Sequence, residues 1–269
     1  MAAERKCALV TGASRGIGRG IATVLAAAGY DLAITYASEA AEAAETARLV
    51  QQTGGRCLVY QAELQDPAVP EQVAGQAAGD LGRIDLLVNN AGLTRHSLVR
   101  TITTGQMDLI YNLNWKAPIL CAKSVANHMV DRGIQGSIIN IASTRGIRAY
   151  PDDLLYGGMK AALIRASESM ALELSEYGIR VNVIAPGATM VRGRISRAEA
   201  AKVSWAGKIP LGRFGTPEEV GQAVAFLASD QAAYITGAVL RIDGGLILPG
   251  MPEDDSPESG YGWAKHLLK

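Results

Sequence analysis

The chain has 269 residues, 48% of them hydrophobic and 19% charged, so it can bury one large core and lacks the composition of a disordered protein. Its 26 basic and 26 acidic residues give a formal charge of zero, which excludes the basic surface that nucleic acid or an anionic membrane would require. The cysteines and histidines show no metal-ligand spacing, and no apolar run reaches the length of a membrane span. We therefore expect a cytoplasmic protein with no metal, nucleic-acid or membrane partner.

The first predicted unit is a strand, a glycine-rich turn and a helix. An apolar stretch over residues 6–11 leads into the turn, and residues 19–30 then have a helical pattern. Such a turn lets the backbone approach a phosphate, which the helix N-terminus holds through free N–H groups and its dipole. The turn is thus a candidate nucleotide cradle, with an ordinary tight loop as the alternative, and its cofactor-binding residues are Gly12, Ser14, Arg15, Gly16, Ile17 and Gly18.

The end of the second predicted strand, residues 31–36, bears on the choice of cofactor. In dinucleotide-binding folds an acid here binds the ribose hydroxyls of NAD, whereas a base pairs with the extra phosphate of NADP. This sequence has Tyr36 and Ser38 here, with no carboxylate at position 36, and Arg15 offers a cation for the phosphate. We expect NADP(H) in preference to NAD(H); the alternative is that Arg15 is an ordinary solvated loop residue.

Strands and helices alternate along the rest of the chain up to residue 248. This order predicts a single-domain α/β protein over residues 1–248, with a Rossmann-type doubly wound parallel sheet of about seven strands and helices on both faces. Residues 105–130 have the pattern of one long helix. The polar stretch 188–215 has the length of a lid or binding segment. The acidic, Pro-rich residues 249–269 are expected to form a flexible or subunit-contacting tail.

A hydroxyl, a phenol and an amine follow the predicted strand over residues 137–143. Ser143 stands at the strand tip, where doubly wound folds keep their ligand crevices. Tyr156 and Lys160 are four residues apart, so on the predicted helix over 153–174 they share one face. A cation near the phenol favours phenolate, which a tyrosine with an ordinary pKa of about 10 needs for acid–base work at neutral pH. Taken alone, such a pair is more often an ordinary surface pair.

Several motifs in order make the chain resemble the short-chain dehydrogenase/reductase family over residues 6 to about 248. They are TGASRGIG at 11–18, NNAG at 89–92, Asn114, Ser143, Tyr156 with Lys160, and Pro186–Gly187. Their joint occurrence is far more specific than any single motif. Within the family the sequence is most similar to the 3-oxoacyl-acyl-carrier-protein reductase branch.

The resemblance implies a reaction and a set of site residues. Tyr156 protonates a carbonyl oxygen while NADPH delivers hydride, Ser143 polarises that oxygen, Lys160 binds the nicotinamide ribose and lowers the pKa of Tyr156, and Asn114 anchors a water for proton resupply. A homotetramer and a small-molecule carbonyl or alcohol substrate are implied as well. The remaining implied cofactor contacts are Glu63, Leu64, Asn90, Ala91, Gly92, Pro186, Gly187 and Thr189, and Leu93 is a candidate substrate contact.

Departures from the family pattern leave the substrate open. The family often has a nicotinamide-contacting Thr where this chain has Val191, so Thr189 is expected to replace it. An Arg that receives the acidic carrier protein is here Leu172, which favours a free sugar, polyol or other small hydroxy-metabolite over a carrier-bound thioester. Arg145 or Arg148 would receive a substrate oxygen or carboxylate, or else pair with Asp152 and Asp153. A remote alternative is a catalytically silent cofactor-sensing module.

Overall fold

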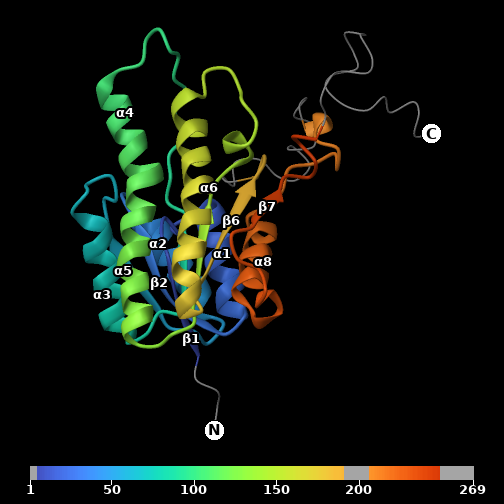
Figure 1. Cartoon of the computed structure of the whole chain (residues 1–269). Coiled ribbons are helices and arrows are strands. Elements are labelled where there is room, and N and C mark those ends of the chain that lie inside the picture. Colours follow the sequence, from blue (N-terminus) through green and yellow to red (C-terminus); the bar gives the residue numbers. More distant parts are fainter. Residues whose placement is uncertain (1–4, 191–205, 249–269) are drawn as a thin grey trace.

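The computed structural model describes residues 5–190 and 206–248 and has one parallel sheet at its centre. Seven strands lie in the order β3-β2-β1-β4-β5-β6-β7, which confirms the predicted doubly wound sheet (Figure 1). Parallel neighbours need long crossovers, and the helices between the strands supply them. The strands are β1 Lys6–Val10, β2 Tyr30–Tyr36, β3 Cys57–Gln61, β4 Leu86–Asn89, β5 Ser137–Ile141, β6 Arg180–Pro186 and β7 Val239–Ile242.

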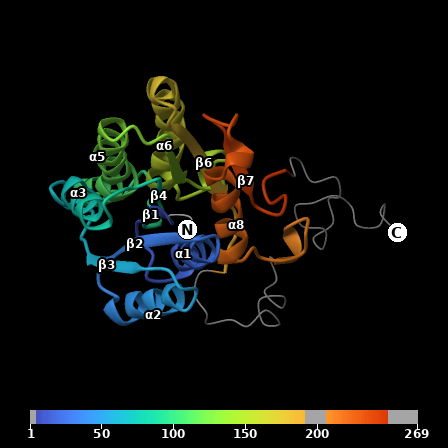
Figure 2. The same cartoon turned by 90° about the horizontal axis from the view of Figure 1, so that it is seen from below.

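Helices cover both faces of the sheet, and Figure 2 shows α1, α2 and α8 on one face and α3, α5 and α6 on the other. Alternate residues of a buried strand serve the two layers, so Val10 of β1 packs toward α1 and α8 while Leu9 packs toward α3 and α5. The helices are α1 Gly16–Ala27, α2 Ala40–Gln51, α3 Val69–Leu81, α4 Thr104–Tyr111, α5 Ala117–Asp131, α6 Leu154–Leu174 and α8 Pro217–Ala228.

The single long helix that the sequence predicts over residues 105–130 is interrupted. A π-helical turn, Asn112–Lys116, separates α4 from α5 and places Asn114 at its centre. Pro118 explains the interruption, because it has no N–H to donate to the carbonyl of Asn114 four residues earlier. Wide turns of this kind occur often at functional sites.

Other sequence predictions have mixed outcomes. Helix α8 begins with a capping box between Thr216 and Glu219. Cys7 and Cys121 are buried and Cys57 partly so, all as free thiols. Most of the predicted lid falls on 191–205 and the predicted tail on 249–269, which lie outside the described residues. In the described ranges no helix is long and apolar enough to cross a membrane.

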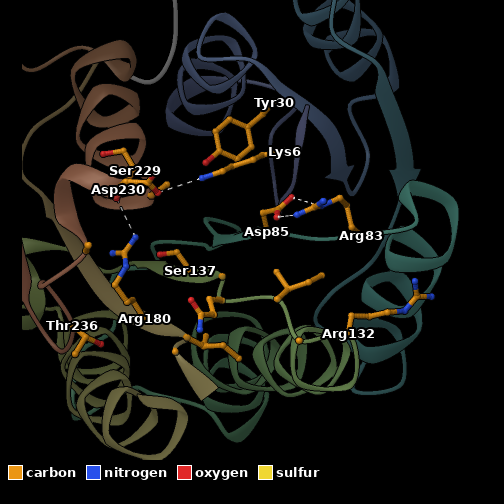
Figure 3. Close-up of a pocket in the computed structure, with 18 of the residues that line it drawn as sticks. Lys6, Tyr30, Arg83, Asp85, Arg132, Ser137, Arg180, Ser229, Asp230 and Thr236 are labelled. Atoms are coloured by element: carbon orange, nitrogen blue, oxygen red, sulfur yellow. Dashed lines mark hydrogen bonds and ion pairs between the residues drawn. The ribbon is translucent and has the colours of Figure 1, made fainter. Parts of the chain in front are cut away.

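The edge of the sheet where the strands begin carries a hollow of about 1180 Å³ (Figure 3). Its charged side chains already have partners: Lys6 pairs with Asp230, Arg83 with Asp85, and Arg180 donates to the carbonyl of Leu227. Lys6 and Arg180 thus join the starts of β1 and β6 to the end of α8 and the turn after it, and the Arg83–Asp85 pair stands just before β4, so we interpret these charges as structural.

Candidate active site

A cleft of about 630 Å³ opens at the carboxyl ends of the strands, near the reversal of strand order between β1 and β4. The structure thus brings together residues that are far apart in the sequence. Of the predicted site residues that the structure describes, Asn114 and Arg148 do not line the cleft. Those that do are Gly12, Ser14, Arg15, Gly16, Ile17, Gly18, Tyr36, Ser38, Glu63, Leu64, Asn90, Ala91, Gly92, Leu93, Ser143, Arg145, Tyr156, Lys160, Pro186, Gly187 and Thr189.

The glycine-rich turn is shaped by two close approaches. Gly12 has a φ of 62°, in the left-handed region, and a Cβ there would lie 2.8 Å from the Cα of Ala91. A Cβ on Gly18 would collide with the carbonyl oxygen of Gly12. Side chains at these positions would fill the space between β1, the loop after β4 and the start of α1. Because both residues are glycines, the backbone of the turn stays accessible from the cleft.

The N-terminus of α1 fits a nucleotide diphosphate. Within the described part of the chain, no side chain caps this helix and no acid stands in its first turn. Its first N–H groups therefore keep their capacity to bind an anion, and the helix dipole favours negative charge there. The residues present thus fit the phosphates of a dinucleotide, as the sequence predicts.

The two asparagines at the end of β4 have different roles. Asn90 donates from Nδ2 to the carbonyls of Thr11 and Gly12 at 3.0 and 2.9 Å, which fixes the glycine-rich turn. Asn89, the last residue of β4, instead donates to the carbonyl of Pro118 at 3.0 Å and to Oδ1 of Asn140 at 2.9 Å. Of the two, Asn90 lines the cleft.

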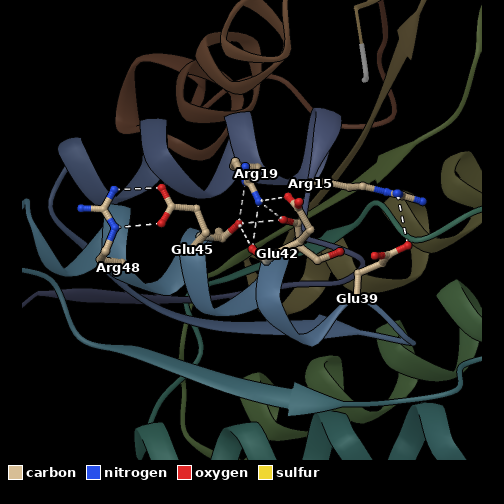
Figure 4. Close-up of polar contacts among 8 residues, drawn as sticks. Arg15, Arg19, Glu39, Glu42, Glu45 and Arg48 are labelled. Atoms are coloured by element: carbon tan, nitrogen blue, oxygen red, sulfur yellow. Dashed lines mark hydrogen bonds and ion pairs between the residues drawn. The ribbon is translucent and has the colours of Figure 1, made fainter. Parts of the chain in front are cut away.

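The end of β2 shows an ion pair that the sequence analysis missed. Arg15 Nη1 lies 3.3 Å from Oε1 of Glu39, the residue before α2, and both side chains are about half exposed (Figure 4). Glu39, Tyr36 and Ser38 all line the cleft. The cation expected to receive a phosphate thus already has a carboxylate beside it, three residues after the position where the sequence analysis looked for one.

The phenol of Tyr156 lies between two hydroxyl groups. The hydroxyl groups of Thr94 and Ser143 lie close enough to interact with it, and both interactions favour the phenolate. Burial opposes them and is the larger effect, so the pKa of Tyr156 is raised above its ordinary value. Thr94 is a residue that sequence reasoning missed, although it follows the NNAG motif by only two residues.

Lys160 lies one turn further along α6 and is 4% exposed. Its ammonium donates to the carbonyl oxygen of Ile141 at 2.9 Å and lies 5.7 Å from the centroid of the Tyr156 ring. Burial lowers the pKa of Lys160 to about 8. In the chain itself the pKa of Tyr156 is raised, because burial of the phenol outweighs its polar neighbours.

Asn114 lies behind the cleft wall and is fully buried. Its Oδ1 accepts the N–H of Leu93 at 3.2 Å, and its Nδ2 donates to the carbonyl of Leu93 at 3.1 Å. A Cβ on Gly92 would lie 2.8 Å from this Oδ1 and 3.4 Å from the ammonium of Lys160, so the amide and the amine face the same glycine. Asn114 thus fixes the loop that carries Leu93 and lies near Lys160.

Arg145 follows the second of the two alternatives left open by the sequence. Its Nη1 lies 3.1 Å from Oδ1 of Asp153, and its guanidinium covers the Tyr150 ring at 5.0 Å from the centroid.

On the cofactor side of the cleft, the N–H of Gly187 donates to the carbonyl of Ile242 at 2.9 Å, and Thr189 makes a β-bridge to Gly215. Val191 lies outside the described residues.

Comparison with known proteins identifies relatives that match almost the whole chain. The family model described as enoyl-(acyl carrier protein) reductase matches residues 12–247. The 3-oxoacyl-(acyl-carrier-protein) reductase FabG of Staphylococcus aureus is 36% identical over 243 residues, which are 90% of this chain and 98% of that protein.

Solved structures agree with this relationship. Acetoin dehydrogenase YohF from Salmonella typhimurium has a TM-score of 0.84 and 36% identity, covering 91% of this chain and 98% of that one. A short-chain dehydrogenase/reductase from Serratia marcescens has a TM-score of 0.82 and 34% identity, covering 90% and 97%. With its glycine-rich turn and its Ser143, Tyr156 and Lys160 in one cleft, the chain belongs to the short-chain dehydrogenase/reductase family.

Proposed function

We propose that the protein is an NADP(H)-dependent carbonyl reductase, and a secondary-alcohol dehydrogenase in reverse, with Tyr156 as its acid–base group. Family membership supports the coarser statement that it is an oxidoreductase that uses NAD or NADP on alcohol or carbonyl groups. The observation that carries the finer proposal is the phenol of Tyr156, which Ser143 and Thr94 contact in the cleft where the glycine-rich turn opens.

In this proposal the chain's residues transfer one proton and stabilise one developing negative charge. Tyr156 donates its phenolic proton to the carbonyl oxygen, and Ser143 donates a hydrogen bond to the same oxygen as it becomes negative. NADPH, when bound, supplies the hydride that reduces the carbonyl carbon. Lys160, with a pKa of about 8, is mostly protonated at neutral pH and stabilises the phenolate that remains. Asn114, close to Lys160, is assigned to the path by which the phenol regains its proton.

The direct test is Tyr156→Phe, which removes the proton while keeping the ring. We expect at least a roughly thousandfold loss of kcat, with NADPH affinity by fluorescence titration within about twofold of wild type. A silent sensor of the cofactor would show no turnover in either protein, and that outcome would replace the enzyme proposal. Turnover by Tyr156→Phe close to wild type would remove the phenol from the mechanism.

For the substrate, we propose a small free ketone or hydroxyketone, including sugars and polyols. Leu172, where the resemblance places a carrier-binding Arg, is 82% exposed, and the exposed acids Glu173 and Glu176 follow it. This surface would attract an acidic carrier protein poorly. A 3-oxoacyl thioester, the substrate type in the name of the S. aureus relative, is the second candidate. NADPH oxidation with an acetoacetyl thioester, and then with diketones, hydroxyketones and keto-sugars, decides between them.

We also propose that NADP(H) is preferred over NAD(H) and that the protein is a homotetramer. The cofactor preference is supported by Arg15 in the glycine-rich turn and Ser38 after β2, both in the cleft. The tetramer rests on family resemblance, and light scattering of the purified protein tests it. A monomer at micromolar concentration would overturn the assembly proposal and leave the chemistry untouched.

A further inference from the structure

Asp153 is a buried carboxylate beside the proposed active site. It stands immediately before α6, yet its side chain does not cap that helix, and the side chain is 4% exposed. In the part of the chain that the structure describes, neither of its carboxylate oxygens has a hydrogen bond of good geometry. Burial of a carboxylate costs several kcal/mol unless a cation compensates it, so its single ion pair carries unusual weight.

The compensating cation is Arg145, which comes from the segment that carries Ser143. The guanidinium Nη1 lies 3.1 Å from Oδ1 of Asp153. The backbone N–H of Arg145 donates to Oγ of Ser143 at 3.1 Å, so Ser143 caps the short helical turn Thr144–Gly146 that contains Arg145. The ion pair therefore connects a residue two positions after Ser143 with a residue three positions before Tyr156.

The two segments are in tight contact. A Cβ on Gly157 would lie 2.8 Å both from the carbonyl oxygen of Arg145 and from Oδ2 of Asp153. A Cβ on Gly146 would lie 2.8 Å from the backbone of Lys160. The turn after Ser143 and the first turns of α6 thus pack backbone against backbone. The Arg145–Asp153 ion pair lies at the N-terminal end of this contact.

The backbone before Asp153 is held in a conformation that costs energy. Among the described residues other than glycine, Asp152 alone has a positive φ, at 55°. The N–H of Ser97 donates to its carbonyl at 2.7 Å, and His96 lies 3.1 Å from its carboxylate. Contacts from the loop that carries Thr94 therefore hold this segment, and strain that is held in this way is typical of functional sites.

We propose that Arg145 and Asp153 are positioning residues whose ion pair sets Ser143 against Tyr156 and places one positive and one negative charge beside the phenol. The inference rests on the proposed function and deepens it. It also changes the role of Arg145, because a guanidinium engaged by a buried carboxylate is not the receptor for a substrate carboxylate. A neutral carbonyl substrate is consistent with this arrangement.

The two charges have opposite effects on Tyr156. Asp153 raises the pKa of the phenol and Arg145 lowers it, and the other groups that face it are Thr94, Ser143 and, on its own helix, Lys160. Removal of one charge alone should shift the acid–base profile in a direction that depends on which charge is lost. Loss of packing alone would not shift the profile in opposite directions in the two variants.

The test compares Asp153→Asn with Arg145→Met and the double variant, and Glu168→Gln is the control. Glu168 forms an exposed ion pair with Arg165 on the same helix, so its loss should leave all parameters within about twofold. We expect each single variant to lose at least about tenfold in kcat with little change in KM for NADPH. The apparent pKa of Tyr156 should fall in Asp153→Asn and rise in Arg145→Met, and the double variant should lose less than the product of the single losses.

A second readout does not require turnover. The alkaline absorbance titration of each protein minus that of its Tyr156→Phe derivative isolates the phenol of Tyr156. If Asp153→Asn is too unstable, Arg145→Lys keeps the charge and should retain the wild-type titration. Shifts in the same direction in both variants, or unchanged titrations in folded variants, would overturn the inference. Wild-type protein that reduces no ketone while these titrations shift as expected would overturn the proposed function and leave the positioning role supported.

Discussion

Lys160 shows how burial changes the chemistry of one side chain. Its ammonium is 4% exposed and has a carbonyl oxygen as its hydrogen-bond partner, so desolvation dominates and lowers its pKa from 10.5 to about 8. Below about pH 8 the folded and unfolded chains both carry the proton, and the folded state bears the full cost of the buried charge. Between about pH 8 and 10.5 only the unfolded chain keeps the proton, so stability rises with pH over that interval.

We therefore expect wild-type protein to gain stability relative to Lys160→Met as pH rises. From the two pKa values the gain is roughly 2 kcal/mol between about pH 7 and pH 9.5. Urea unfolding of both proteins at the two pH values measures it, and the difference between proteins cancels the titration of all other groups. If the two proteins differed in free energy of unfolding by the same amount at both pH values, Lys160 would have an ordinary pKa.

A second residue-scale prediction concerns Glu39, the carboxylate that pairs with Arg15. The 2′-phosphate of NADPH would bring negative charge to Arg15 and therefore has to compete with Glu39. We expect Glu39→Gln to lower KM for NADPH by roughly two- to fivefold, corresponding to the weak energy of an exposed pair, with little change in KM for NADH. Glu45→Gln is the matched control, since Glu45 pairs with Arg48 on the same helix at a site that does not line the cleft (Figure 4).

Opposite results would change the cofactor assignment. A higher KM for NADH in Glu39→Gln, with NADPH unaffected, would mean that Glu39 binds ribose hydroxyls and that the enzyme prefers NAD(H). Equal effects of Glu39→Gln and Glu45→Gln would mean that the change acts through helix α2 or through net charge.

At the scale of elements, helices α1 and α8 approach each other through glycine. A Cβ on Gly221 of α8 would lie 2.7 Å from the carbonyl oxygen of Gly20 and 3.0 Å from Cγ2 of Val24, both in α1. The backbone of Gly20 has little room to retreat, because Gly20 itself abuts Pro217. This contact fixes α1, and therefore the position of its phosphate-binding N-terminus, relative to the sheet.

Gly221→Ala should therefore destabilise the protein by roughly 1–3 kcal/mol, the range for overpacking a tight contact. Gly75→Ala is the control within a helix, since a Cβ on Gly75 of α3 meets nothing within 4 Å. It should stabilise by up to about 1 kcal/mol, because alanine has the higher helix propensity. Thermal unfolding of the two variants shows directly whether each substitution lowers or raises the stability. Stabilisation by both substitutions would show that α1 and α8 separate easily.

At the scale of the whole molecule, the fold was predictable because local and long-range signals agree. Apolar runs with helical stretches between them fix the order of elements, and right-handed parallel crossovers leave few topologies. The sequence analysis missed the π-helical turn at Asn114 because the apolar periodicity continues through it, although Pro118 is a sequence signal for an interruption. The Arg15–Glu39 pair was not predicted, and the Arg145–Asp153 pair was foreseen only as one of two alternatives, because several acids lie within reach in the sequence and packing alone selects one.

The balance of charge over the whole chain leads to a last prediction, on the substrate. With 26 basic and 26 acidic residues, and with acids after Leu172 on α6, the protein lacks the long-range field that steers an acidic carrier protein. We expect kcat/KM for an acetoacetyl-carrier-protein thioester to stay within about threefold of that for a short acetoacetyl thioester, and the ratio to be unchanged between about 20 and 200 mM salt. Leu172→Arg should raise the ratio at low salt only, whereas Met107→Arg, at an exposed position on α4, should not. A wild-type ratio of tenfold or more that falls with salt would show that a basic surface elsewhere receives the carrier, and would favour the thioester reductase over the free-ketone reductase.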